Sequence, residues 1–135
     1  MADTFELELA TPERLLLREA VTEAQIPALN GFIGVLPGHA PLLAELGTGY
    51  AVYQAGGRRH YMALNGGFVE VQADKVRVLA DTAENAEEID VQRAEAALQR
   101  AQERLAHATV GIDIGRALNA LHRAEARLEA ARRAG

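Results

Sequence analysis

Residues 50–80 read YAVYQAGGRRHYMALNGGFVEVQADKVRVLA and contain four short runs with the alternating pattern of β-strands. Gly56-Gly57 separates the first two runs, and a glycine pair at this place is typical of a tight hairpin turn. Asp74 separates the last two runs and predicts a second hairpin. The four expected strands are Tyr50–Gln54, Arg58–Leu64, Phe68–Gln72 and Val76–Ala80.

The same pattern extends toward the N-terminus. Thr4–Ala10 alternates, with Phe5, Leu7 and Leu9 on one face and Glu6 and Glu8 on the other. Gly and Pro interrupt the chain at short intervals from Pro12 to Gly67. Many short strands with frequent turns are typical of a β-sandwich or barrel. We therefore predict a β-sandwich domain over residues 1–83.

Residues 84–135 show a helical pattern instead. This segment lacks Pro and is rich in Ala and Arg. Small and large apolar residues recur at helical spacing and form one stripe on each of two expected helices, about Glu88–Ala108 and Asp113–Arg132. Thr109-Val110-Gly111 lies between them and has low helix propensity. We therefore predict that the two helices fold as an antiparallel hairpin. The stripes are Ala94, Leu98, Ala101 and Leu105, then Ile114, Ala117, Leu121, Ala124, Leu128 and Ala131.

An internal repeat relates the two expected helices. The pattern from Ile89 to Leu105 returns 23 residues later, from Ile112 to Leu128. Each copy places an Asp where its helix should start, and such an Asp accepts backbone N–H bonds and favours the positive end of the helix dipole. The fold class predicted overall is α+β, an N-terminal β-sandwich followed by a C-terminal antiparallel two-helix hairpin.

Composition and motifs give no support to a catalytic site. The 135 residues include no Cys, and the formal net charge is −5. The four His do not stand at metal-ligand spacing, and neither a phosphate-binding P-loop nor a nucleophile elbow is present. We expect no enzyme activity, no metal, no nucleic-acid binding, no membrane-spanning segment and no signal peptide.

One string is far more specific than its individual turns. Gly31–Leu42 reads GFIGVLPGHAPL and resembles the G-x-x-G-x-L-P-G-H-x-P-L segment of the ATP synthase ε chain family. Leu64–Val71 looks like the second signature of that family, and Leu79–Ala83 resembles its junction between sandwich and helices. The order and spacing of these segments fit over essentially the whole chain.

The resemblance implies a non-catalytic rotor subunit of a bacterial F-type ATP synthase. The sandwich is then expected to bind the γ subunit and the polar loops of the membrane c-ring. The helical hairpin would lie against the sandwich or extend along γ into the α/β catalytic head, where it opposes ATP hydrolysis. Such a protein would lie peripherally at the cytoplasmic face of the bacterial inner membrane, held there only through the complex.

The resemblance also implies subunit contacts at Phe32, Pro37 and His39. Some relatives carry an acidic residue where this chain has Phe32. We expect an apolar contact with the membrane ring in place of a charged one, or shielding against a neighbouring subunit. His39 is alternatively a buried, hydrogen-bonded side chain within the loop.

In some members of the family the folded hairpin binds ATP. Ile89–Ala94 matches the I/L-D-x-x-R-A nucleotide motif at every fixed position, and seven-residue spacing puts Arg93 and Arg100 on one helix face. Asp90 either bonds the ribose or base or only caps the helix. Alternatively, these arginines form ion pairs on solvent-exposed helix faces and bind no ligand. Glu84, Arg100, Arg123 and Arg127 also stand where nucleotide-binding relatives have matching residues, and Arg116 is a weaker addition. The ATP-binding residues that the resemblance implies are therefore Glu84, Ile89, Asp90, Arg93, Ala94, Arg100, Arg116, Arg123 and Arg127.

Two other function classes stay open at this stage. The chain could be a stand-alone ATP-sensing module, or a helical adaptor whose hairpin joins the helices of a partner. Copurification with γ in a fixed ratio separates a rotor subunit from both. An Arg-rich nucleic-acid binder is disfavoured because the hairpin lacks aromatic residues for base stacking.

Overall fold

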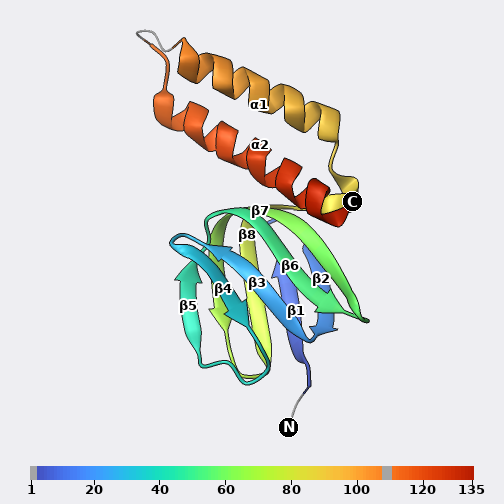
Figure 1. Ribbon diagram of the computed structural model, residues 1–135. Helices are drawn as coiled ribbons and strands as arrows, with labels where there is room; N and C mark the ends of the chain where they lie inside the picture. The colour runs from blue at the N-terminus through green and yellow to red at the C-terminus, as the bar shows by residue number, and fades with distance from the viewer. Residues whose placement is uncertain (1–2, 108–110) are drawn as a thin grey trace.

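The computed structural model describes residues 3–107 and 111–135, and it has the predicted α+β architecture (Figure 1). The strands come first along the chain, and the two long helices follow and project from one end of the sandwich. The strands are β1 (Phe5–Ala10), β2 (Leu15–Val21), β3 (Glu23–Ala28), β4 (Gly31–Val35), β5 (Leu42–Glu45), β6 (Thr48–Ala55), β7 (Arg58–Val71) and β8 (Lys75–Asn85). The helices are η1 (Ala86–Glu88), a single 3-10 turn, then α1 (Val91–Ala106) and α2 (Ile114–Ala134).

The strands pair in the order β2-β1-β8-β7-β6-β3-β4, and β5 joins the side of β7. Neighbours are antiparallel except for β1 and β8, which run parallel. β7 pairs with β8 on one side and with both β6 and β5 on the other. This long central strand therefore holds the two layers of the sandwich together.

Both predicted hairpins are confirmed. Gly56 and Gly57 have φ of 60° and 75° and close the turn between β6 and β7. The second turn joins β7 to β8, where the N–H of Gln72 donates to the carbonyl of Lys75 at 2.8 Å. Positive φ at both turn residues matches the right-handed twist of the strands, which explains the two glycines.

The prediction of separate strands at Arg58–Leu64 and Phe68–Gln72 is wrong, because both runs belong to β7. Gly66 and Gly67 lie inside the strand with φ of 65° and 108°. The pairing with β8 keeps the same register on both sides of the glycines. The glycines bend the strand without ending it. The partner strand β8 also continues to Asn85, beyond the point where its sequence pattern stops.

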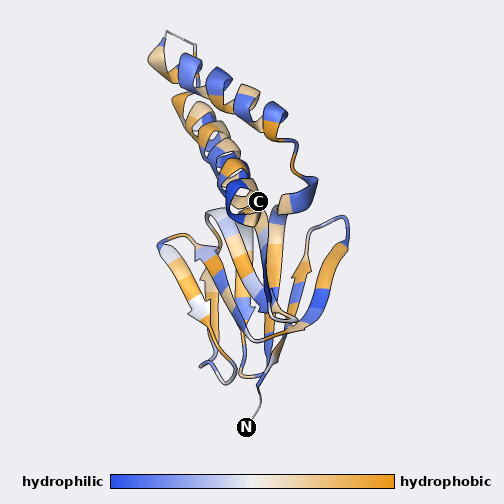
Figure 2. Cartoon of the chain, turned by 45° about the vertical axis from the view of Figure 1, so that its right-hand side comes forward, coloured by the Kyte–Doolittle hydropathy of each residue, from blue (hydrophilic) through white to orange (hydrophobic). Residues whose placement is uncertain are grey.

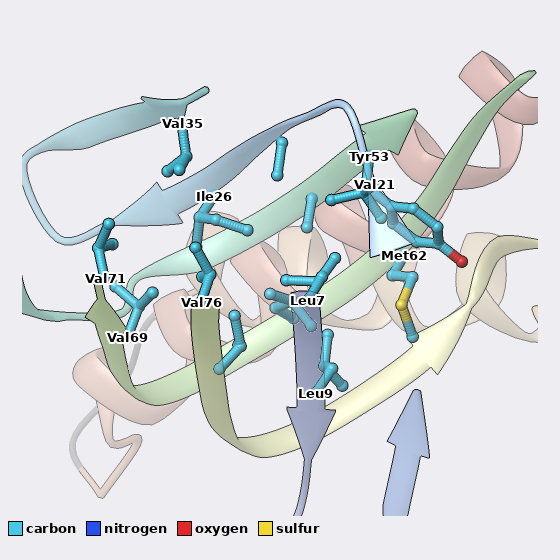
Figure 3. Close-up of a cluster of buried hydrophobic side chains, with 14 of the residues drawn as sticks. Leu7, Leu9, Val21, Ile26, Val35, Tyr53, Met62, Val69, Val71 and Val76 are labelled. Atoms are coloured by element: carbon cyan, nitrogen blue, oxygen red, sulfur yellow. The ribbon is translucent and has the colours of Figure 1, made fainter. Parts of the chain in front are cut away.

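The sandwich core is aliphatic and lies between the strands (Figure 3). Phe5, Leu7 and Leu9 are all buried, as the alternation of β1 predicts. Val69 and Val71 of β7 face the same core. Bands of opposite hydropathy alternate along the strands in Figure 2, which is typical of sheets with one buried face.

The two helices begin with the same cap. The side chain of Asp90 accepts a hydrogen bond from the N–H of Arg93 at 3.1 Å, and Asp113 accepts one from the N–H of Arg116 at 3.0 Å. The repeat therefore has the same local structure in both copies. Each cap satisfies a backbone donor that a helix start leaves unpaired.

The predicted helix bounds need correction. Glu88 belongs to η1, and α1 begins after Asp90. α2 begins at Ile114, after its cap, and continues to Ala134. Residue 108, the predicted end of the first helix, lies outside the described residues, as do Thr109 and Val110 of the predicted connection. Gly111 has a φ of 98°.

The helices pack closely along alanines, as the stripes predict. Ala94 and Ala101 of α1 and Ala117 and Ala124 of α2 are buried. Ile114 is an exception, since it is 52% exposed. α2 packs on β6 and β7, whereas α1 packs on α2 (Figures 1 and 2). Within the described residues, no helix combines the length and apolar character needed to cross a bilayer.

Candidate functional site

A cavity of about 670 Å³ lies where the hairpin meets the sandwich. The end of β8, the adjacent part of β7 and the turn between β1 and β2 line it on the sandwich side. Alanines of α1 and α2 form much of its apolar wall. The volume is large enough for a small organic ligand.

Five arginines and two carboxylates line this cavity. Arg100 and Arg104 lie on α1 and Arg123 and Arg127 on α2, each pair four residues apart and hence on one helix face. The fifth is Arg14, in the turn between β1 and β2. The carboxylates are Glu84 of β8 and Glu88 of η1.

Arg127 and Glu84 form a two-point ion pair across the site. Nε of Arg127 donates to Oε1 of Glu84 at 2.7 Å, and Nη2 donates to Oε2 at 3.2 Å. Both side chains are about 30% exposed, at 27% and 31%. This pair ties α2 to the end of β8. The planar guanidinium suits such fork-like contacts with carboxylates and with phosphates alike.

The other four arginines have no ion pair or side-chain hydrogen bond with any residue that the structure describes. The cavity is thus rich in guanidinium groups that are free to bind an anion. Several convergent guanidiniums fit a polyphosphate. Glu88 offers acceptors for the N–H or hydroxyl groups of a ligand, whereas Oδ1 of Asn65 already accepts a hydrogen bond from Oγ1 of Thr48 at 2.6 Å.

The structure brings together four of the predicted ATP-binding residues, Glu84, Arg100, Arg123 and Arg127. Ile89 is buried beside the cavity, with Ala63 and Ala130. Asp90 caps α1, Arg93 is exposed in its first turn, and Ala94 is buried against α2. These four motif residues therefore support the start of α1 and do not line the cavity.

Arg116 lies apart from the predicted set, near the tip of the hairpin. It lines a second hollow with Asp113 and Gly111, and this hollow shares Arg104 and Ala117 with the main cavity. Its repeat partner Arg93 is at the other end of the hairpin, because the helices are antiparallel. The structure thus does not bring these two arginines together.

Three charged cavity residues are absent from the sequence-based set: Arg14, Glu88 and Arg104. The repeat contains a signal for Arg104, since this residue is the counterpart of Arg127. Glu88 follows Glu84 by four residues. Arg14 has no such signal, since its place in the cavity depends on tertiary structure alone.

The three predicted interface residues lie at two ends of β4. Pro37 and His39 are half-buried in the loop that follows β4, where the N–H of Gly38 donates to the carbonyl of Ala73 at 2.8 Å. Nδ1 of His39 lies 2.7 Å from the carbonyl oxygen of Ala40. Phe32 lies at the start of β4, is 52% exposed and is near α2, at the end of β4 away from Pro37 and His39.

Phe32 is linked to the hairpin through Tyr50 of β6. The ring centroids of Phe32 and Tyr50 are 5.0 Å apart, and the guanidinium of Arg133 lies 4.6 Å from the centroid of Tyr50. The cation–π contact of Arg133 with Tyr50 thus holds the end of α2 on the sandwich. Within α2, hydrogen bonds from Arg132 and Arg133 lower the pKa of Glu129.

Comparisons with known proteins agree with this architecture. The family described as ATP synthase, Delta/Epsilon chain, beta-sandwich domain matches residues 4–86, and the corresponding long alpha-helix domain matches residues 87–132. An ATP synthase epsilon chain from Solibacter usitatus (strain Ellin6076) is 58% identical over 83% of this chain and 84% of its own. Another, from Koribacter versatilis (strain Ellin345), is 51% identical over 78% of this chain and 74% of its own.

A solved structure agrees as well. A chain in the Euglena gracilis mitochondrial ATP synthase (OSCP/F1/c-ring, rotational state 1) superimposes with a TM-score of 0.84 at 27% identity. The match covers 97% of this chain and 82% of that chain. Two domain matches in the expected order, together with relatives above 50% identity, leave one assignment: the chain belongs to the ATP synthase epsilon chain family.

Proposed function

We propose that this chain is a non-catalytic rotor subunit that couples the catalytic head of an F-type ATP synthase to its c-ring. Its hairpin restrains ATP hydrolysis, and ATP bound in the cavity between hairpin and sandwich relieves that restraint. The observation that carries the regulatory part is the cavity of about 670 Å³, which is lined by four guanidiniums that have no partner among residues 3–107 and 111–135. Membership of the epsilon chain family supports the rotor part.

An apolar patch on the outside of the sandwich is the proposed contact with γ. Phe68 and Leu79 are direct cross-strand partners and are 55% and 51% exposed. Leu43 of β5 is 70% exposed and lies diagonally across from Phe68 on the same face. Adjacent exposed apolar side chains of this size are typical of a protein interface.

Copurification with γ tests this contact. Phe68→Ser combined with Leu79→Ser is expected to lose γ, whereas Leu15→Ser on β2, an equally apolar and 48% exposed site, retains it. Equal recovery of γ with wild type, the double variant and Leu15→Ser would show that the γ contact lies elsewhere on the chain. The c-ring contact is proposed for Pro37 and His39, and membrane association at the cytoplasmic face follows only through these partners.

The folded hairpin is proposed to bind ATP through its triphosphate. Arg100 and Arg123 reach the cavity from opposite helices, so a polyphosphate between them satisfies both guanidiniums. The alanine-lined wall leaves room for the nucleoside, and Glu84 and Glu88 accept its donors.

Calorimetry with ATP decides this proposal. The wild-type chain is expected to bind ATP, and Arg123→Gln is expected to bind about 10- to 150-fold more weakly, since a hydrogen bond to a charged group contributes about 1.5–3 kcal/mol. Arg58→Gln is the matched control, because Arg58 begins β7 away from the cavity. Absence of heat with wild type at millimolar ATP would contradict the regulatory role.

Restraint of hydrolysis requires the hairpin to leave the sandwich. Its freed arginines then meet carboxylates on the catalytic head, and ATP favours the docked form in proportion to its higher affinity for it. Hydrolysis by the reconstituted head at low ATP is expected to be slower with the full chain than with a chain ending at Glu88, which retains the whole of β8. If both chains are incorporated equally and the rates of ATP hydrolysis are equal, the hairpin does not restrain hydrolysis and the subunit is purely structural.

A further inference from the structure

The cavity has one basic side chain that does not come from the helices. Arg14 lies in the turn between β1 and β2, far before the arginines of α1 and α2 in the sequence, and lines the same space. The turn itself is closed by a hydrogen bond from the N–H of Thr11 to the carbonyl of Arg14 at 2.9 Å. The backbone of Arg14 is therefore fixed, while its guanidinium has no partner among the described residues.

We propose that Arg14 is a phosphate ligand supplied by the sandwich, so that a bound nucleoside triphosphate is held between both domains. This inference rests on the proposed binding of ATP in the cavity. α1, α2 and the sandwich each present to the same space at least one guanidinium that is unpaired within the described part of the chain. These are Arg100 and Arg104 on α1, Arg123 on α2 and Arg14 on the sandwich. A triphosphate has enough anionic oxygens to contact all three elements at once.

The position of Arg14 gives it a role that the helical arginines cannot fill. Contacts made only by α1 and α2 would hold the hairpin closed, but they would not tie it to the sandwich. Arg14 is the cavity arginine on the sandwich side of the ligand. Because a ligand shifts an equilibrium only by its differential affinity for the two states, a phosphate contact with Arg14 adds to the contacts of Glu84 on the sandwich side and makes ATP favour docking over release more strongly.

The other reading of Arg14 is a solvated turn residue, and the two readings differ in what they predict. A solvated side chain affects neither ATP affinity nor docking. A phosphate ligand affects both, and its loss leaves the apo protein as stable as before because it has no partner there. Arg14→Gln removes the charge and keeps much of the length of the side chain.

The experiment measures ATP affinity and hairpin docking in the same full-length proteins. Calorimetry with ATP and with inorganic triphosphate compares wild type, Arg14→Gln, Arg14→Lys and the control Arg58→Gln. Since the chain has no Cys, thiols introduced at Asp74 and Ala106 take a fluorophore pair that reports the distance from sandwich to hairpin.

Arg14→Gln is expected to weaken both ligands about tenfold and to require correspondingly more ATP for docking, with partial recovery in Arg14→Lys and no change in Arg58→Gln. Thermal unfolding without ligand checks that the variants are folded. Wild-type affinity and wild-type docking in Arg14→Gln would overturn the role of Arg14 while leaving ATP binding intact. No binding by wild type would overturn both proposals, and an equal loss in Arg58→Gln would show a general charge effect instead.

Discussion

Two adjacent glycines allow one strand to serve two sets of neighbours. Gly66 and Gly67 have positive φ, a conformation that side chains disfavour, and a Cβ at Gly67 would collide with the carbonyl oxygen of Leu79. The close approach of the Gly67 backbone to β8 keeps the two strands paired through the bend. Glycine at this place is thus required by both the backbone angle and the space.

Gly67→Ala is expected to lower the free energy of unfolding by about 2–4 kcal/mol, because strain and a backbone clash add. Gly34→Ala is the matched control, since a Cβ there meets nothing within 4 Å and φ is not positive. Its effect should stay within about 1 kcal/mol. Urea unfolding measures both variants, and similar midpoints for the two would contradict the steric argument.

A second residue-scale feature is the ion cluster around Glu8, on the face of β1 away from the core. Lys75 lies 3.3 Å from Oε2 of Glu8, and Arg18 and Arg77 are close behind at 3.5 and 3.7 Å. Burial opposes the charge and raises the pKa of Glu8, but the hydrogen bond and charge of Lys75, with the two arginines, lower this pKa overall.

A lowered pKa in the folded state means that the Glu8 cluster stabilises the protein above the ordinary pKa of glutamate. The stabilisation is lost as the pH falls through the lowered pKa. Glu8→Gln should therefore be less stable than wild type at neutral pH and equally stable in strong acid. Glu45→Gln on β5, which has no ion pair among the described residues, should run parallel to wild type. Urea unfolding from neutral pH to strong acid measures the difference in the free energy of unfolding between each variant and wild type.

At the scale of elements, what the sequence predicts correctly is local. The turn at Gly56-Gly57, the alternation of β1 and the caps at Asp90 and Asp113 each depend on a few neighbouring residues. The continuous β7 was missed because Gly66 and Gly67 have the same composition as a turn, and only their pairing with β8 distinguishes a bend from an end.

The same distinction holds for the candidate site. Arg100, Arg123 and Arg127 are predicted from the resemblance to nucleotide-binding relatives, and helical spacing adds that Arg123 and Arg127 share one face. The repeat would have added Arg104. Arg14 required knowledge of which turn lies under the hairpin, and no periodicity contains that information.

The helix pair depends on small residues at its contact. Ala124 is 3% exposed between the helices and also lines the cavity, so Ala124→Leu must push the helices apart or fill the cavity. We expect a loss of about 1–3 kcal/mol from overpacking and weaker ATP binding. Ala96→Leu, on the exposed face of α1, is the matched control. Far-ultraviolet circular dichroism on heating and calorimetry provide the two readouts, and wild-type behaviour of Ala124→Leu in both would refute close packing.

At the scale of the whole molecule, the two domains are held very differently. The sandwich has a large aliphatic core, whereas the hairpin docks through a small cluster of Ala63, Ala86, Ile89 and Ala130. Alanine buries little area, and apolar burial contributes roughly 25 cal/mol per Å². The Arg127–Glu84 pair and the Arg133–Tyr50 contact add to the same interface. Such an interface suits a hairpin that docks and leaves.

A disulfide between the domains tests whether leaving is needed for restraint of hydrolysis. Ala63 and Ala130 are buried in one cluster, and the chain contains no other Cys to compete. In the Ala63→Cys, Ala130→Cys variant, the oxidised protein should bind γ yet fail to slow hydrolysis by the catalytic head, because its arginines stay at the sandwich. Reduction should restore the slowing, and each single variant should behave like wild type under both conditions. Equal slowing before and after reduction, with the cross-link verified, would mean that the docked hairpin itself inhibits, and the proposed exchange of partners by its arginines would be wrong.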